Sequence, residues 1–460
     1  MKLEDINNVY FLGLGGIGMS ALARWFKAQG FHVHGYDRTQ THLTEQLEHE
    51  GIKIHYEDSI KNIPSNIKSD KHHTLVIYTP AIPKDHQEFS FLKINGYEIK
   101  KRSEVLGILT HNKFTIAVAG THGKTTTSSM IAHILRYSGV DSAAFLGGIT
   151  QNYGTNFLIN NAEDAPVVVE ADEYDRSFLT LSPNIAIITS TDADHLDIYG
   201  EKEEVLKSFN EFASKVKEDG KLFIHSEVSL EKGSPEKTKT YSLDSGNFTA
   251  RNVTIQKGNF HYALNKDGQN LGEIILQVPG FHNVENSLAA IATALELNIS
   301  FEKIQGALAS YKGVKRRFEY ILRTDKIIQI DDYAHHPTEL NAFIKSAKAI
   351  YPDKKLTVVF QPHLFSRTRD FVVEFAESLS LADEVLLLDI YPARELPIEG
   401  ISSQIIFDKI KIENKQLCRK AQITDIIQNG DYEVIATVGA GDIDQLIDPI
   451  KNILTSKYNV

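Results

Sequence analysis

Cysteine is almost absent from this 460-residue sequence, and long apolar runs and an excess of positive charge are missing. Its single cysteine, Cys418, excludes an internal disulfide framework and a metal site built from cysteines alone, and it is typical of a reducing compartment. No run approaches the roughly 18 apolar residues of a membrane-spanning helix. The opening residues, Met1 to Asp5, contain no apolar core of a signal peptide. We therefore expect a cytoplasmic protein that does not bind membranes.

The net charge of -11 excludes a cationic field over the whole molecule. Nucleic acids and anionic bilayers are bound through such a field, so neither is expected as a partner. An anionic ligand would need a locally built site. The hydrophobic share of 42% and the charged share of 24% are ordinary for a soluble globular chain. At about 150 residues per domain, the length indicates about three domains.

Short segments rich in Val, Ile and Leu alternate with helical patterns along the whole chain. This alternation is typical of α/β domains with mostly parallel sheets. We place three such domains at residues 1–112, 113–320 and 321–460. A polar stretch, 226–247, is expected to form exposed hairpins or loops, and 443–456 a closing helix. The strands expected in the three domains are 9–12, 33–36 and 74–78, then 114–119, 166–169 and 185–189, then 326–330, 356–360, 385–389 and 433–438.

A glycine motif, Gly13 to Gly18, matches the pattern G-x-G-x-x-G between a predicted strand and a helix predicted over 19–29. Its glycines let backbone N–H groups approach a pyrophosphate, whose charge is favoured at a helix N-terminus. Asp37 lies about 20 residues further on, where a carboxylate accepts from a ribose hydroxyl. The motif predicts a bound NAD, FAD or UDP-sugar, and the alternative is a glycine-rich turn without a ligand.

A second glycine loop, residues 120–126 (G-T-H-G-K-T-T), follows the first strand of the second domain and precedes a helix predicted over 128–137. Val118 stands where a full Walker A pattern has its first glycine, so the loop is a shorter variant. Its backbone N–H groups can still hold phosphates, Lys124 can reach the β and γ oxygens, and Thr125 can bind Mg²⁺. The alternative is a polar helix cap.

Two acidic clusters, 170–175 and 192–197, follow strands of the same domain. Mg²⁺ prefers several oxygen ligands, which makes Glu170 with Thr125 a candidate magnesium site. A lone histidine such as His195 is more often structural, and only the phosphate loop in the same domain favours a metal role for it. Zinc is a weaker interpretation because no second His or Cys has suitable spacing.

Two further polar motifs have open interpretations. Residues 281–286 precede a helix predicted over 287–295, and their asparagines suit either the edge of adenine or a helix cap. The basic run 315–317 is either a solvated surface or the source of a guanidinium for a γ-phosphate.

In the third domain, the segments 331–338 and 361–369 each follow a predicted strand. At the carboxyl ends of adjacent strands, such segments line the crevice where open α/β sheets bind ligands. Two adjacent histidines in the first segment are candidates for a metal pair, and Asp332 suits ribose recognition. Arg367 or Arg369 suits the clamping of a small carboxylate.

Taken together, these motifs make the chain resemble the Mur ligases over nearly its whole length. The resemblance implies an N-terminal Rossmann-like domain for a UDP-sugar, a central P-loop ATPase domain, and a C-terminal Rossmann-like domain that brings an amino acid. The residues that carry it are Gly13 to Ser20, Gly120 to Thr126, Glu170 to Asp175, Asp194 and His195, His282, Asn283 and Asn286, Arg317 and Phe318, Asp332 to Pro337, Phe360 to His363, and Gly439 to Ile443.

The resemblance also implies roles for single residues. The UDP moiety would be held by Gly15, Gly16, Gly18 and Asp37. ATP would be bound by Gly120, Thr121, His122, Gly123, Lys124, Thr125, Thr126, Asn283, Asn286, Arg317 and Asp332. In that set the two asparagines face adenine, the arginine the γ-phosphate and the aspartate the ribose. Mg²⁺ would be bound by Thr125, Glu170 and His195, L-alanine by His335, His336, His363 and Arg367, and the catalytic residues would be Lys124, His195, Arg317 and His336.

The activity implied by the resemblance is ATP-dependent joining of L-alanine to the lactyl carboxylate of UDP-N-acetylmuramate. It would proceed through an acyl phosphate, release ADP and phosphate, and belong to peptidoglycan precursor synthesis. ATP and Mg²⁺ are the implied cofactors, and a monomer or weak homodimer is expected. Leu364 stands where some alanine-adding relatives have arginine, which leaves the carboxylate clamp to Arg367 or its neighbours.

Three other functions compete with this one. A recycling ligase of the same family joins the UDP-sugar to a ready-made tripeptide, and its members tend to carry F-E-P-R where this chain has F-Q-P-H at 360–363. An NAD-dependent oxidoreductase would explain residues 13–18 alone. A non-catalytic switch that binds UDP-sugar and ATP would hydrolyse ATP without regard to any amino acid.

Overall fold

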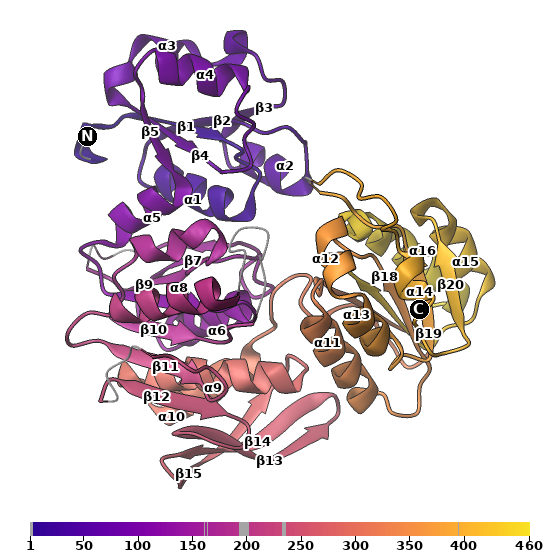
Figure 1. Ribbon diagram of the computed structural model, residues 1–460. Coiled ribbons are helices and arrows are strands. Elements are labelled where there is room, and N and C mark those ends of the chain that lie inside the picture. Colours follow the sequence, from indigo (N-terminus) through magenta and orange to yellow (C-terminus); the bar gives the residue numbers. More distant parts are fainter. Residues whose placement is uncertain (1–2, 161, 163, 193–201, 232–235, 394) are drawn as a thin grey trace. The chain divides into compact units, whose positions relative to one another are not determined.

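The computed structural model describes residues 3–160, 162, 164–192, 202–231, 236–393 and 395–460. Three β-sheets carry the fold, and most of their neighbouring strands are parallel (Figure 1). The expected α/β class with three domains is therefore confirmed. The chain also divides into two compact units, Met1–Thr249 with Lys266–Gly268 and Ser287–Ala307, and Ala250–Asn265 with Gln269–Asn286 and Leu308–Val460. None of the helices in the described part is long and apolar enough to span a membrane.

The first sheet has the strand order β3-β2-β1-β4-β5, and all of its pairs are parallel. Alternate residues of β1 pack on opposite faces, because Phe11 joins the core under α1, α2 and α5 while Tyr10 joins the core under α3 and α4 (Figure 1). The elements are β1 (Asn8–Leu12), β2 (His32–Tyr36), β3 (Lys53–His55), β4 (Thr74–Tyr78), β5 (Glu98–Lys101), α1 (Ile17–Ala28), α2 (His42–His49), α3 (Ser65–Ser69), α4 (Gln87–Ile94) and α5 (Arg102–Thr110), with 3₁₀ turns at Leu3–Asp5, Ile60–Asn62 and Lys71–His73.

The second sheet has the order β15-β14-β13-β12-β11-β10-β6-β9-β7-β8, with β6, β9, β10, β11 and β12 all in parallel pairs. Its strands are β6 (Thr115–Ala119), β7 (Ala143–Phe145), β8 (Phe157–Leu158), β9 (Val167–Glu170), β10 (Ile185–Ile188), β11 (Lys221–His225), β12 (Thr238–Ser242), β13 (Phe248–Gln256), β14 (Asn259–Lys266) and β15 (Gln269–Leu276). Its helices are α6 (Lys124–Tyr137), α8 (Lys202–Ser214), α9 (Phe281–Glu296) and α10 (Phe301–Ser310), with a 3₁₀ helix at Tyr174–Thr180.

One prediction for this sheet is partly wrong. The stretch 226–247, expected to form only hairpins or loops, contains β12, which pairs with β11 in parallel. The polar residues Thr, Lys and Ser show no strand pattern in the sequence, because only the last two residues of the strand, Tyr241 and Ser242, are buried. A pattern of hydrophobicity therefore gives no signal over most of its length.

The third sheet has the order β16-β17-β21-β18-β19-β20 and is parallel except for the pair β16–β17. Helices α11, α13 and α14 cover one face, and α15 and α16 cover the other (Figure 1). The elements are β16 (Glu319–Arg323), β17 (Ile328–Asp332), β18 (Leu356–Phe360), β19 (Glu384–Leu388), β20 (Lys415–Cys418), β21 (Val434–Val438), α11 (Pro337–Ile350), α12 (Phe365–Asp370), α13 (Val372–Leu379), α14 (Gln404–Phe407), α15 (Ile423–Asn429) and α16 (Ile447–Tyr458), with 3₁₀ turns at Lys420–Gln422 and Asp442–Leu446. The predicted closing helix is thus a 3₁₀ turn followed by α16.

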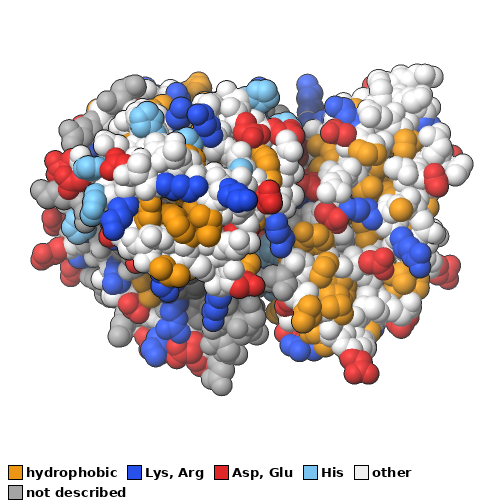
Figure 2. All heavy atoms as spheres, turned by 90° about the horizontal axis from the view of Figure 1, so that it is seen from above, with side chains coloured by type: hydrophobic (Ala, Val, Ile, Leu, Met, Phe, Trp, Pro, Cys, Tyr) orange, Lys and Arg blue, Asp and Glu red, His pale blue; other side chains and the backbone are white. Residues whose placement is uncertain are grey.

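Charge is distributed without segregation on the face that Figure 2 shows. Among the residues coloured there, Lys and Arg side chains lie between Asp and Glu side chains. The sequence as a whole has a net charge of -11. An anionic substrate is therefore expected to depend on local groups such as helix N-termini and single cations.

Candidate active site

The first glycine loop, residues 13–18, joins β1 to α1. Gly13 has a φ of +85°, a conformation that favours glycine over any residue with a side chain. Asp37 follows β2 and lies beside this loop, as predicted. Its carboxylate accepts the N–H of Gly15 at 2.7 Å and the N–H of Thr39 at 3.0 Å. The acid therefore holds the loop in shape in addition to lying at the predicted nucleotide site.

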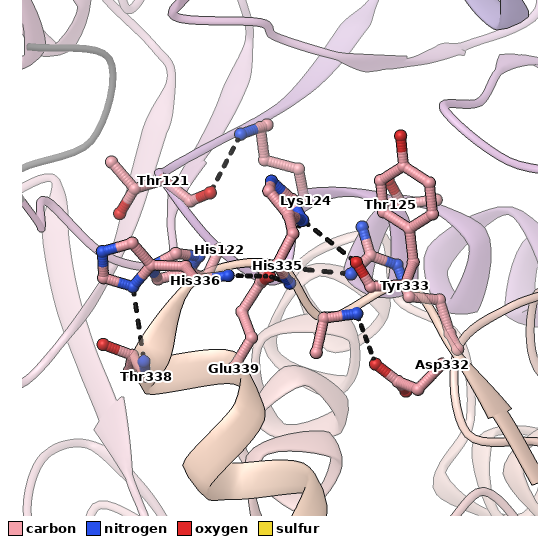
Figure 3. Close-up of polar contacts among 12 residues, drawn as sticks. Thr121, His122, Lys124, Thr125, Asp332, Tyr333, His335, His336, Thr338 and Glu339 are labelled. Carbon is pink, nitrogen blue, oxygen red and sulfur yellow. Dashed lines mark hydrogen bonds and ion pairs between the residues drawn. The ribbon is translucent and has the colours of Figure 1, made fainter. Parts of the chain in front are cut away.

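The phosphate loop, residues 120–126, joins β6 to α6, and the side chain of Lys124 folds back over it. Its ammonium donates to the carbonyl oxygen of Gly120 at 2.6 Å. It also donates to the carbonyl oxygen of Thr121 at 3.3 Å (Figure 3). It also lies 2.8 and 2.9 Å from the two carboxylate oxygens of the buried Glu173. Burial alone would lower the pKa of Lys124, but the nearby carboxylates, Glu173 first, raise it above its usual value. The lysine is therefore a charged ammonium at neutral pH.

The short segment that follows β10 contacts the phosphate loop. Ser190 Oγ accepts the N–H of His122 at 2.9 Å and lies 2.8 Å from the hydroxyl of Thr121. Asp192 lies 3.3 Å from His122 Nε2. His195 lies outside the described residues, so its roles as metal ligand and catalytic residue stay predictions.

Two of the three predicted magnesium ligands come together at the carboxyl end of β9. Thr125 Oγ1 donates to Glu170 Oε2 at 2.9 Å, and the N–H of Gly147 donates to the same oxygen at 2.9 Å. A Cβ atom on Gly147 would lie 2.2 Å from that oxygen, so only glycine permits this approach. Hydroxyl and carboxylate oxygens are the ligands that Mg²⁺ prefers. Within the described ranges no group of three His, Cys, Asp or Glu side chains is placed to hold a metal ion.

A cavity of about 100 Å³ in the first unit is lined by Gly18 of the first glycine loop and by Glu170, the predicted magnesium ligand that accepts the hydroxyl of Thr125. The residues that line it come from the start of α1, from α5, from the end of β7 and from the acidic cluster after β9: Ile17, Gly18, Ala21, Leu22, Arg102, Leu106, Phe145, Leu146, Gly147, Glu170 and Asp172. The predicted UDP-sugar loop and the predicted magnesium ligand therefore border the same space.

Arg102 is a residue of this cavity that the sequence pattern did not single out as functional. Its guanidinium lies 3.0 Å from Asp172 Oδ2 and so close to Gly18 that a Cβ atom there would lie 2.0 Å from Nη1. Burial raises the pKa of Asp172, but the positive charges of Arg102 and then Lys124 lower it by more. The pKa therefore lies below its usual value, and the carboxylate stays charged. Nothing in the sequence marks Arg102 beyond its place at the end of three consecutive basic residues, 100–102, a pattern that is also typical of a solvated surface.

In the second unit, the predicted adenine-facing asparagines lie inside the first turns of α9, which begins at Phe281 and not after residue 286 as expected. Asn283 Nδ2 donates to the carbonyl oxygen of Pro279 at 2.6 Å, and Asn286 Nδ2 donates to Asn283 Oδ1 at 3.1 Å. Both asparagines are buried. The helix start was predicted too late because polar letters interrupt the apolar periodicity there. Burial lowers the pKa of the neighbouring His282 to about 4, so its ring is neutral.

Asp332, the predicted ribose ligand, ends β17. Its two carboxylate oxygens accept the N–H groups of Phe318 and Ala334, each at 2.7 Å. Burial raises its pKa to about 7, although Arg317 opposes this shift. The carboxylate therefore fixes the connection between α10 and β16 to the third sheet, a role that the sequence did not suggest.

Arg317, the predicted γ-phosphate ligand, lies on that same connection. Its guanidinium is 5.2 Å from the ring centre of Tyr333 and 3.8 Å from Glu339 Oε1. Arg316 lies 5.1 Å from the same ring centre and pairs with the fully buried Asp331 at 3.0 Å. The two adjacent arginines thus have different environments. Arg316 pairs with the buried carboxylate of Asp331, whereas Arg317 lies near Glu339 of α11.

The predicted L-alanine ligands separate into a cluster and one outlier. His335 and His363 have ring centres 6.0 Å apart, and Arg367 Nη1 lies 3.5 Å from His363 Nδ1. His336 instead caps α11, where its Nδ1 accepts the N–H of Thr338 at 3.3 Å (Figure 3). Three of the four predicted residues therefore lie close together at the carboxyl end of β17 and β18.

Comparisons with known proteins cover nearly the whole chain. The model of the Mur ligase family, catalytic domain, matches residues 8–114, the Mur ligase middle domain matches 118–294, and the Mur ligase, glutamate ligase domain, matches 316–443. The chain is 50% identical to the UDP-N-acetylmuramate–L-alanine ligase of Christiangramia forsetii over 98% of this chain and 99% of the relative. It is 49% identical to that of Cytophaga hutchinsonii, over 100% and 99%.

Solved structures agree with these matches. The crystal structure of UDP-N-acetylmuramate–alanine ligase from Thermotoga maritima superposes with a TM-score of 0.82 at 29% identity, covering 98% of this chain and 99% of that one. A murein peptide ligase from Psychrobacter arcticus has a TM-score of 0.68 at 22% identity, with coverage of 98% and 99%, and shares the fold. These matches show that the chain belongs to the Mur ligase family.

Proposed function

We propose that this chain is an ATP-dependent acid–amino-acid ligase that joins L-alanine to the lactyl carboxylate of UDP-N-acetylmuramate, releasing ADP and phosphate, in peptidoglycan precursor synthesis. The observation that carries the proposal is the cavity bordered by both Gly18 and Glu170, because it supports a UDP-sugar beside the carboxylate that accepts the hydroxyl of Thr125, a residue of the phosphate loop. The identity of about half of all residues with UDP-N-acetylmuramate–L-alanine ligases, over nearly their full length, supports the amino acid.

The reaction joins a poor electrophile to an amine in two steps. A carboxylate oxygen of the UDP-sugar attacks the γ-phosphorus of ATP, ADP leaves, and an acyl phosphate forms. The amine of L-alanine then attacks the carbonyl carbon and loses a proton, and phosphate leaves with the original carboxylate oxygen. Positioning and charge neutralisation are the main catalytic terms in such transfers. Lys124 and Arg317 would neutralise phosphoryl charge, and His195 and His336 are the other candidate catalytic residues.

The residues that bind each substrate are part of the same proposal. The UDP moiety would contact Gly15, Gly16, Gly18 and Asp37, and the ATP phosphates the loop 120–126. Asn283 and Asn286 would contact adenine, Arg317 the γ-phosphate and Asp332 the ribose. L-alanine would contact His335, His336, His363 and Arg367. The clustering of three of these last four residues supports the amino-acid site.

Magnesium would be held by Thr125 and Glu170, with His195 as the third predicted ligand. The contact of a hydroxyl with a carboxylate oxygen at 2.9 Å supports this assignment, because both are hard oxygen donors. When bound, Mg²⁺ supplies positive charge to the phosphoryl oxygens.

Further proposals concern the molecule as a whole. The domain limits 1–112, 113–320 and 321–460 are supported by the matched ranges of the three family models, although the second limit falls inside β16. A cytoplasmic location and the absence of membrane and nucleic-acid partners are proposed on the composition. We also propose a monomeric or weakly dimeric state.

The test is phosphate release from ATP and Mg²⁺ with UDP-N-acetylmuramate, measured without amino acid, with L-alanine and with the tripeptide L-Ala-γ-D-Glu-diaminopimelate. The proposal expects release, with a product heavier by one alanyl group, only with L-alanine. Dependence on the tripeptide would make the chain a recycling ligase. Release that ignores both amino components would favour the binding switch.

A further inference from the structure

Asn156 is a fully buried residue directly before β8, and its side chain contacts three residues of α1. Its Nδ2 donates to the carbonyl oxygen of Ile17 at 2.6 Å and to Ser20 Oγ at 3.0 Å. Its Oδ1 accepts from the guanidinium of Arg24. The amide therefore binds the first turns of α1, which follow directly on the glycine loop.

The backbone of Asn156 continues this contact toward the phosphate loop. Its carbonyl oxygen accepts the N–H of Leu146 at 2.9 Å. The next residue, Gly147, donates its N–H to Glu170 Oε2, and Glu170 accepts the hydroxyl of Thr125. Hydrogen bonds on either side of the Leu146–Gly147 peptide thus connect the first turn of α1 with the first turn of α6, and Leu146, Gly147 and Glu170 line the cavity described above.

Arg24 makes this connection rigid. The buried guanidinium donates to Glu50 through Nε at 2.8 Å and through Nη2 at 2.7 Å, so its remaining donor group is aimed at Asn156. A bidentate pair of this kind fixes the orientation of the guanidinium plane. Only an amide offers a donor to Ile17 and Ser20 and an acceptor to Arg24 at the same time.

We propose that Asn156 is a positioning residue for phosphoryl transfer, which sets the distance between the loop for the UDP-sugar and the residues at the ATP phosphates. It does so by holding α1 against the segment that carries Gly147 and Glu170. The substrate carboxylate and the γ-phosphorus would then meet at reacting distance only while this contact is intact. The inference rests on the proposed function, because it assigns these two loops to the two substrates.

The test uses Asn156→Asp, which keeps the size and the acceptor but removes both donated hydrogen bonds. We expect kcat for L-alanine-dependent phosphate release to fall by about 10- to 100-fold. The KM values for ATP and UDP-N-acetylmuramate, and the Kd of each measured singly by calorimetry, should stay within about twofold of the unmodified chain, because neither loop itself is altered. The matched control is Asn160→Asp on the same segment, whose side-chain amide donates to the carbonyl oxygen of Ala162; its kcat should be unchanged.

A kcat of Asn156→Asp equal to that of the unmodified chain would overturn the inference, and so would a loss confined to the Kd of one substrate. If the aspartate variant does not fold, Asn156→Ala is measured below its melting temperature with the same expectations. An unmodified chain without L-alanine-dependent release would overturn the proposed function, and the inference with it. An active unmodified chain with an equally active variant would overturn the inference alone.

Discussion

Lys124 and Glu170 are the two side chains of the first unit on which the proposed chemistry most depends. Replacing either by alanine should lower kcat by about 100-fold or more, because each removes charge from the phosphoryl-transfer site. Phosphate release measures the rate, and circular dichroism checks that the fold persists. The matched control is Lys221→Ala in β11, whose ammonium lies 3.9 Å from Glu296 in the same unit. Near-native kcat in either site variant would contradict the assignment.

Arg367 and Arg369 lie on one helix, α12, and differ in burial, which makes them a matched pair. Arg367 is 7% exposed and lies beside His363, whereas the side chain of Arg369 is 52% exposed and pairs with Asp370. Arg367→Ala should raise the KM for L-alanine by about tenfold or more, the value of one charge-assisted hydrogen bond. Arg369→Ala should leave it unchanged. The reverse order of effects would move the carboxylate clamp to Arg369.

Glu88 is a fully buried acid in the first domain, bonded to Tyr10 and His55, and burial raises its pKa to about 7. A raised pKa means that the folded state favours the protonated acid. Its contribution to stability is therefore complete below about pH 4.5 and is lost as the pH rises through 7. Glu88→Gln removes this dependence.

The unfolding free energy of Glu88→Gln relative to the unmodified chain should thus rise between pH 4.5 and 7, by on the order of 3 kcal/mol, and level off above that. The single tryptophan, Trp25, lies in the same domain, so its fluorescence during denaturation reports on the correct part of the chain. Parallel pH profiles of the two proteins would show that Glu88 titrates normally.

At the scale of elements, the connection between α10 and β16 is held to the third sheet by Arg316. Its guanidinium pairs with buried Asp331 at 3.0 Å and donates to the carbonyl oxygen of Gly439 at 2.7 Å. Arg316→Leu leaves that carboxylate buried without its cation, which should lower the unfolding free energy of this domain by about 3 kcal/mol. Thermal unfolding of Arg316→Leu and of the neighbouring substitution Arg317→Leu measures the difference.

The neighbouring Arg317 provides the contrast. Its pairing with Glu339 at 3.8 Å is partly exposed, so Arg317→Leu should cost less than about 1 kcal/mol of stability. It should nevertheless lower turnover strongly, because the proposed function places it at the γ-phosphate. Equal destabilisation by the two substitutions would contradict the separate environments of these arginines.

The accuracy of the sequence-based predictions also differs from element to element. The strands after which chemistry was expected, such as β1, β6 and β9, were found close to the predicted ranges, because buried parallel strands are continuous apolar runs with glycine or acidic residues at their ends. The start of α9 and the strand β12 were not predicted, since the polar residues there form hydrogen bonds within the protein instead of facing water.

Contacts between site residues could likewise be predicted only where known motifs contained both residues. The contact between Thr125 and Glu170 could be predicted, because both belong to motifs whose chemistry requires them together. Arg102 with Asp172 and Asn156 with Ile17 could not, since each pair joins segments far apart in the sequence and no spacing links them. The backbone contacts of Asp332 could not be predicted either, because the sequence shows an aspartate whether its carboxylate binds backbone N–H groups or a ribose.

At the scale of the whole molecule, three α/β sheets carry three sets of polar residues at the carboxyl ends of their strands. The first two sets border one cavity within a single compact unit. The third set, on the sheet that contains β17 and β18, supplies the proposed amino-acid ligands. A ligase that activates one substrate before a second attacks it needs separate sites of this kind, and the family membership accounts for all three.

The most direct test of this account follows one oxygen atom. UDP-N-acetylmuramate labelled with ¹⁸O in its lactyl carboxylate is incubated with the protein, ATP, Mg²⁺ and L-alanine, and the released phosphate is analysed by mass spectrometry. The account predicts one labelled oxygen per phosphate released from fully labelled substrate, formed together with the alanyl product and absent without L-alanine. Unlabelled phosphate, or release that does not require L-alanine, would contradict it.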